Sequence, residues 1–246
     1  MLEPEVLYED NHVLVAVKPA NLLSQADDTG DPDMLSLLKE YVRVKYEKPG
    51  AVYLGLVHRL DRPVGGLMVF ARTSKAASRL VPQLQQHAMG REYLCVAQGS
   101  LPERFDREDW LKKDERTNTV TVCPAGTPGA KRAVLHGRVL RREGTLCLCA
   151  IRLETGRSHQ IRVQMAHAGA PLWGDARYGG GRPGQPIALF GYRLSFEHPT
   201  THQIMRFERL PQGGIWERCG VNALSSRKNG EDNGEGAVEI VTTGHL

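Results

Sequence analysis

His58-Arg59-Leu60-Asp61-Arg62-Pro63-Val64-Gly65-Gly66 is the stretch from which the fold of this chain is best predicted. Apolar runs lie on both sides of it, at residues 54–57 and 67–70. Proline and glycine interrupt regular structure, so the pattern predicts a sharp bend between two buried strands. The bend carries one carboxylate, Asp61, between two arginines, and nearby positive charge favours the ionised form of a carboxylate. An ionised carboxylate on a rigid bend is a candidate nucleophile or base.

The composition is that of a globular protein with a mildly basic body. The chain has 246 residues, 41% of them hydrophobic, which suffices for one large domain or two small ones. Its net charge is +4, but residues 225–246 hold two basic and four acidic residues, which leaves +6 for residues 1–224. Such a body is compatible with nucleic acid as a partner.

The five cysteines form no Cys-x-x-Cys pair, so we expect buried thiols in a reducing compartment and no disulfide framework. The chain opens without a signal peptide and has no apolar run of membrane-spanning length. We therefore expect a cytoplasmic protein that does not bind a membrane.

Strand-like and helix-like segments alternate irregularly along the chain. Two helices are predicted in the first third, one capped by Asp31 and one by Thr73, and a third is predicted from an N-cap at Ser158 to Gly169. Strands are predicted at 13–17, 54–57, 67–70, 91–97, 133–140, 145–153, 190–196 and 205–210, and residues 102–132 are polar and turn-rich. This order favours an α+β fold with a mixed, largely antiparallel sheet. We expect residues 1–222 to form one domain and the acidic tail, 223–246, to be disordered.

Each chemically interesting residue also has an ordinary structural interpretation. Asp61 alone would be a turn residue, Tyr93 a core aromatic and Asp175 a turn former. The residues Arg157, His159 and Arg162 could be solvated, or they could bind a phosphate near a helix start. Metal chemistry is poorly supported, because the only His-x-x-x-His pair spans a proline and no cysteine cluster accompanies it. Glycine-rich nucleotide loops are absent too. We predict no metal and no cofactor.

Taken together, five segments resemble the RluA-type family of RNA pseudouridine synthases. They are Tyr8 to Pro19, His58 to Asp61, Arg91 to Gly99 with its Arg-Glu-Tyr, Thr155 to Gly179 with its Thr-Gly-Arg-Ser-His-Gln-Ile-Arg, and Leu194 to Pro199. They occur in the family's order and span about residues 6–210. Five ordered motifs are far more specific than one. The resemblance implies the family's α+β catalytic fold, with a catalytic cleft across the sheet.

The resemblance also implies a reaction and roles. Uridine within RNA would be isomerised to pseudouridine, with Asp61 as nucleophile or base, Arg162 paired with Asp61, and Tyr93 stacked on a flipped base. RNA contacts would come from Arg59, Arg62, Lys18, Arg157 and His159. The RNA could be ribosomal or transfer RNA, and we expect a monomer.

One departure from the family concerns the bend itself. After His-Arg-Leu-Asp and two further residues, the family usually has Thr-Ser-Gly, where this chain has Val64-Gly65-Gly66. A hydroxyl that could support the catalytic loop is lost, which bears on the rigidity of that loop. Two alternatives remain open: a non-catalytic RNA-binding or RNA-chaperone protein on the same fold, and a glycoside hydrolase, which would need a second carboxylate near Asp61.

Overall fold

The computed structural model describes residues 3–227 and 238–241. The chain divides into two compact units, each made of separated segments. Unit 1 comprises residues 1–90, 191–209 and 231–246, and unit 2 comprises residues 91–190 and 210–230.

Unit 1 is a sheet whose central strands are buried. Its strands lie in the order β1-β2-β4-β10-β11-β12, with β3 beside β4, and comprise β1 (Glu5–Glu9), β2 (Val13–Lys18), β3 (Gly55–Leu56), β4 (Gly65–Ala71), β10 (Leu189–Glu197), β11 (Ile204–Glu208) and β12 (Val238–Val241). Every residue of β2 and β4 is buried, as their continuous apolar sequences predict. The two strands are antiparallel, and their register places Lys18 opposite Gly66 at the end next to the predicted bend.

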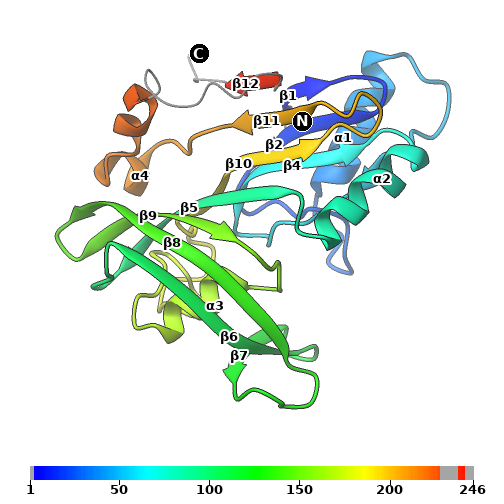
Figure 1. Cartoon of the computed structure of the whole chain (residues 1–246). Helices are drawn as coiled ribbons and strands as arrows, with labels where there is room; N and C mark the ends of the chain where they lie inside the picture. The colour runs from blue at the N-terminus through cyan, green and yellow to red at the C-terminus, as the bar shows by residue number, and fades with distance from the viewer. Residues whose placement is uncertain (1–2, 228–237, 242–246) are drawn as a thin grey trace. The chain divides into compact units, whose positions relative to one another are not determined.

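Two helices accompany this sheet (Figure 1). The helix α2 (Ser74–Gln85) begins after Thr73, whose side chain accepts from the backbone N–H of Ala76, and this confirms the predicted cap. The helix α1 (Met34–Lys45) begins two residues later than predicted. Its N-cap is Asp33, because this residue has the extended backbone and accepts from Ser36 N–H, so the prediction of Asp31 was wrong.

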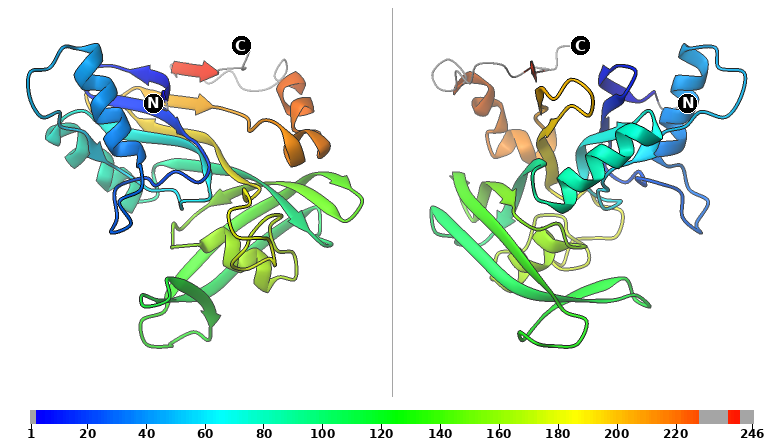
Figure 2. Two further views of the ribbon diagram at one scale, coloured as in Figure 1. Left: turned by 180° about the vertical axis from the view of Figure 1, so that it is seen from behind. Right: turned by 45° about the vertical axis from the view of Figure 1, so that its right-hand side comes forward.

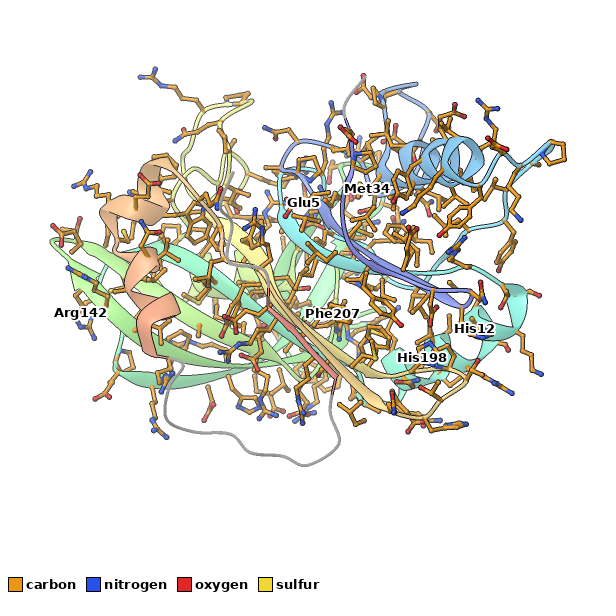
Figure 3. All side chains as sticks on the ribbon, turned by 90° about the horizontal axis from the view of Figure 1, so that it is seen from above. Glu5, His12, Met34, Arg142, His198 and Phe207 are labelled. Atoms are coloured by element: carbon orange, nitrogen blue, oxygen red, sulfur yellow. The ribbon has the colours of Figure 1, made fainter. Side chains whose placement is uncertain are left out.

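Side chains from distant segments lock unit 1 together. His198 Nε2, just after β10, lies 2.9 Å from the Asp10 carboxylate in the turn between β1 and β2. Figure 3 shows His198 beside His12, with which it makes an edge-on ring contact at 5.7 Å between centroids. The ring of Phe207 on β11 stacks on that of Phe196. These contacts join the first and last motifs of the sequence.

Unit 2 is an antiparallel sheet with one helix packed on one face. Its strands lie in the order β5-β9-β8-β6-β7 and comprise β5 (Gly90–Gln98), β6 (Arg104–Asp114), β7 (Thr119–Cys123), β8 (Lys131–Glu143) and β9 (Leu146–Leu153). Figures 1 and 2 show α3 (Gln160–His167) on one face of β6 and β8. The buried side chains Leu111, Val120, Ala133 and Val163 form the core between them. A short helix, α4 (Gly214–Arg218), and a 3₁₀ helix (Val221–Arg227) complete the unit.

The fold class predicted from the sequence is confirmed: α+β with a mixed, largely antiparallel sheet. Among the strand pairs with a described register, only β11 and β12 run parallel. The predicted cleft across the sheet stays a prediction. No helix in the described residues is long and apolar enough to span a membrane.

Two segments of the predicted tail belong to regular elements, and the expectation of disorder stays a prediction. Residues 223–227 belong to the 3₁₀ helix, and β12 pairs with β11. The remainder of the predicted tail, 228–237 and 242–246, lies outside the described residues. Glycine and acidic residues led to the prediction, whereas β12, with the β-branched Val238, Ile240 and Val241, extends the edge of the sheet at β11.

Candidate active site

The bend that carries Asp61 is a tight turn tied to a neighbouring loop. Val64 N–H donates to the Asp61 carbonyl at 2.9 Å, which closes the turn over Arg62 and Pro63. The Ser24 hydroxyl donates to the Leu60 carbonyl at 2.7 Å and accepts from the Leu60 N–H at 3.1 Å. One buried hydroxyl therefore holds both backbone groups of the residue before Asp61, whose own side chain is partly exposed.

Lys18 supports the same turn from inside. Its side chain is fully buried, and Nζ donates to the carbonyls of Pro19 at 3.0 Å, Leu22 at 2.6 Å and Arg62 at 3.2 Å. Burial lowers the pKa of Lys18 to about 7, while the charge of Asp61 acts in the opposite direction. Its three donors are directed to backbone oxygens, and the predicted phosphate contact of this lysine stays a prediction. In this structure Lys18 is a positioning residue for the bend.

These contacts bear on the missing Thr-Ser hydroxyls. Val64 and Gly65 are buried, and the turn is held instead by Ser24 and Lys18. Gly66, which the family pattern retains, has φ +137°, and an added Cβ would lie 2.4 Å from the backbone nitrogen of Gly191. The third position is therefore glycine because β10 passes too closely for a side chain.

The two arginines that flank Asp61 differ in their surroundings. Both are exposed. Arg62 forms an ion pair with Asp31 at 2.6 Å, whereas Arg59 has neither an ion pair nor a hydrogen bond within the described part of the chain. Arg59 is thus the more available of the two for an anionic ligand.

Tyr93 and Arg162 belong to unit 2. Tyr93 lies on β5 directly opposite Ile151 of β9 and is 7% exposed. Arg162 lies in the first turn of α3 and is 5% exposed. It binds Asp175 through two hydrogen bonds, Nε to Oδ2 at 2.9 Å and Nη2 to Oδ1 at 2.8 Å. The predicted pairing of Arg162 with Asp61 stays a prediction.

Asp175 does more than form a turn. Burial raises its pKa, but the hydrogen bonds and charge of Arg162 and the backbone N–H groups of Arg177 and Tyr178 outweigh that effect and hold the pKa below the usual value. Asp175 is therefore ionised at neutral pH. It fixes the direction of the Arg162 guanidinium, which also lies 5.3 Å from the centre of the Tyr178 ring.

The turn before α3 is held rigidly to β8. Thr155 Oγ1 accepts from Val134 N–H at 2.8 Å and donates to Gln160 Oε1 at 2.8 Å, and Gln160 Oε1 also accepts from Arg157 N–H at 3.0 Å. The residue before α3 is His159, in the left-handed region at φ +52° with no side-chain cap bond, so the prediction of Ser158 as N-cap was wrong. Gly169, at φ +75°, ends the helix as predicted.

Two predicted RNA contacts lie in this turn. The Arg157 side chain is exposed, and only its Nε atom forms a hydrogen bond within the described residues, to the Arg132 carbonyl at 2.9 Å. His159 is 9% exposed, and its Nδ1 is hydrogen-bonded to the Tyr178 hydroxyl at 2.8 Å. That hydroxyl also accepts from Val120 N–H, which connects the turn to β7. Arg157 is placed to meet a ligand, whereas His159 is engaged within the unit.

Sequence reasoning missed several residues that support the site. Ser24 and Gln160 belong to no recognisable cap or turn pattern, because each acts on backbone groups at least three residues away. Asp175 could have been found, since a Gly-Asp pair shortly after an arginine-containing helix offers that helix an acid. Among the described residues, no three His, Cys, Asp or Glu side chains gather as a metal site would require.

Comparison with known proteins identifies the family. A model of the family described as RNA pseudouridylate synthase matches residues 12–167. A protein named ribosomal large subunit pseudouridine synthase D from Pseudomonas aeruginosa is 36% identical over 233 residues, covering 87% of this chain and 71% of the relative. Proteins of that name from Haemophilus ducreyi and Yersinia pestis are 37% and 40% identical, over 87% and 74% of this chain. The chain spans 65% and 54% of those two relatives.

Two solved structures share the fold. Human RNA pseudouridylate synthase domain containing 4 has a TM-score of 0.71 at 17% identity, covering 87% of this chain and 91% of that one. Human RNA pseudouridylate synthase domain containing 1 has a TM-score of 0.68 at 20% identity, covering 94% and 97%. At these identities the likeness establishes the fold alone.

Proposed function

We propose that this chain, which belongs to the RNA pseudouridylate synthase family, isomerises uridine to pseudouridine in RNA with Asp61 as the catalytic carboxylate. The observation that carries the proposal is the turn of Asp61. Asp61 is partly exposed and follows Leu60, whose backbone N–H and carbonyl both bind the Ser24 hydroxyl. The buried Lys18 binds the carbonyl of Arg62, the residue after Asp61. Such a fixed acid is suited to attack a substrate, since its position costs no rearrangement during reaction.

The reaction exchanges one bond to the sugar for another. The N1–C1′ bond of uridine breaks, the base turns, and a C5–C1′ bond forms, while a hydrogen leaves C5 and N1 gains a proton. Asp61 would either attack the sugar or remove a proton from it to give a glycal. Both routes require an ionised carboxylate that reaches the ribose.

Tyr93 and Arg162 take the supporting roles in this proposal. Tyr93 would stack on the target base after it leaves the RNA helix, which explains the need for an aromatic side chain on a rigid strand. Arg162 would orient the Asp61 carboxylate. The bidentate bond to Asp175 supports that role, because it fixes the guanidinium before any substrate arrives.

The proposed substrate is large-subunit ribosomal RNA. The names of the relatives support it over transfer RNA. The basic body of the chain and the exposed Arg59 and Arg157 fit a polyanionic partner. We expect the protein to work as a monomer in the cytoplasm, and sedimentation of the purified chain tests the first of these.

The experiment uses large-subunit ribosomal RNA carrying tritium at C5 of uridine. The wild-type protein is expected to release tritium, and Asp61→Asn is expected to release none while binding the RNA as tightly. Asp28→Asn is the matched control, because Asp28 is exposed in the same unit, and it should behave as wild type. Equal release by Asp61→Asn and wild type would refute the role of Asp61. Binding without release by the wild type would favour the non-catalytic RNA-binding alternative.

A further inference from the structure

Arg91 is a basic side chain to which no role has yet been assigned, and it lies on the same face of β5 as Tyr93. Side chains alternate along a strand, so residues two apart share a face and their Cα atoms lie roughly 6.6 Å apart. The register of β5 with β9 is regular over this stretch, with Tyr93 opposite Ile151 and Glu92 opposite Arg152. Arg91 therefore lies one step along the strand from the proposed base platform.

The Arg91 side chain has no acceptor within the described part of the chain. It is half-buried, its Nε atom is buried without a hydrogen-bond partner, and it forms no ion pair there. Arg162 in the same unit shows the usual solution for a buried guanidinium, a bidentate carboxylate. A partly buried cation with an unsatisfied donor is costly to fold. An acceptor supplied by a ligand would remove that cost.

The guanidinium of Arg91 lies directly against Gly156. A Cβ added to Gly156 would come within 2.6 Å of Nη1, 3.1 Å of Nη2 and 3.3 Å of Cζ. Gly156 has no positive φ, so its backbone would accept alanine. An alanine at this position would therefore displace the end of the Arg91 side chain.

The space beside Gly156 that the Arg91 guanidinium fills, called the seat below, has rigid and basic surroundings. Gly156 lies between Thr155, which is bound to β8, and Arg157, whose N–H is bound by Gln160. The Nη atoms of Arg157 bind no other described residue. Two guanidinium groups are therefore presented from one strand and the adjoining turn, beside an aromatic ring suited to a base.

We propose that Arg91 binds a backbone phosphate of the RNA next to the nucleotide that stacks on Tyr93, in a seat formed by Gly156. The inference rests on the proposed function, because it assigns a phosphate to the same RNA. Guanidinium groups match phosphate oxygens with two parallel hydrogen bonds, which positions the strand as well as binding it. Arg91 thereby fixes how far along β5 the target nucleotide lies.

The test measures RNA binding in an Asp61→Asn background, so that no turnover occurs. Binding of a large-subunit ribosomal RNA transcript is followed over a salt series for Arg91→Gln and its parent. Loss of one phosphate contact is expected to weaken binding on the order of 10-fold at low salt and to reduce the salt slope by about 0.7–0.9. Unchanged affinity and slope would overturn the inference. Failure of the proposed function would appear separately, as a wild-type protein that makes no pseudouridine.

Gly156→Ala supplies an independent test of the seat. It should displace the guanidinium and reproduce the Arg91→Gln defect, and the double variant should be no weaker than either single one, because both remove the same contact. Arg104→Gln is the control for net charge: Arg104 is exposed, unpaired among the described residues and on the opposite face of the sheet of unit 2. An equal loss in Arg104→Gln, or additive losses for the first two variants, would contradict the proposal. Unfolding midpoints near wild type show that the variants are folded.

Discussion

Lys18 shows that a sequence can place a residue without showing what its side chain contacts. Its place at the end of a buried strand was clear from the sequence, and a lysine in a family that binds RNA suggests a phosphate contact. The structure buries the whole side chain and directs Nζ to three carbonyls, one of them in the turn of Asp61. Which carbonyls converge on a lysine depends on tertiary packing that no local pattern encodes.

The lowered pKa of Lys18 predicts a pH-dependent stability. The folded value of about 7 lies below the ordinary 10.5, so between these pH values the unfolded chain binds more protons than the folded one. The contribution of Lys18 to the free energy of unfolding should therefore rise with pH from about 7 to 10. Chemical denaturation of wild type and Lys18→Met at several pH values measures it, because other titrating groups cancel in the difference. A difference that stays flat or falls with pH would contradict the buried, shifted lysine.

At the scale of elements, the sequence predicted the helices and strands whose apolar residues recur with a clear period. It missed those whose apolar residues do not. Strands 133–140 and 145–153 are present as β8 and β9, and Thr73 begins α2. The strands β6 and β7 were not predicted, because β6 carries charged residues such as Arg107 and Asp109 on the same face as its apolar ones. The start of α3 was misplaced because a side chain from inside the helix, Gln160, organises the preceding turn.

The ion pair between Arg162 in α3 and Asp175 in the following turn should contribute far more to the free energy of unfolding than a surface ion pair does. Asp175→Asn removes the charge that binds Arg162 in a buried site, where loss of one partner costs about 3–5 kcal/mol. The control is Glu108→Gln, which breaks the exposed pair with Arg132 and should cost less than about 1 kcal/mol. Denaturant unfolding of both variants measures the difference. Similar small losses in the two would show that Asp175 does not anchor the helix.

At the scale of the whole molecule, the sequence order of the elements was predictable but their grouping was not. The chain divides into two compact units, each completed by segments distant in sequence, and the single domain expected for residues 1–222 stays a prediction. Unit 1 needs β10 and β11 from beyond residue 188 to complete the sheet begun by β1, β2 and β4. Hydrophobic periodicity identifies strands, but strand pairing between residues more than a hundred positions apart leaves no local signal. The function was predicted from the five family motifs, because these motifs contain the candidate site residues themselves.

The end of the chain offers a test of this long-range grouping. Strand β12 continues the sheet of unit 1 by pairing with β11 over four residue pairs, from Met205 with Val238 to Glu208 with Val241. Truncation after Arg227 should expose the edge of β11 and lower the free energy of unfolding by about 2 kcal/mol, or roughly 4–8 °C in Tm. The removed segment, 228–246, has one basic and four acidic residues, so RNA binding should not weaken and tritium release should persist. Calorimetry and the tritium assay together decide: an unchanged Tm would mean that β12 adds nothing to the sheet, and lost activity with an unchanged Tm would place part of the function in the tail.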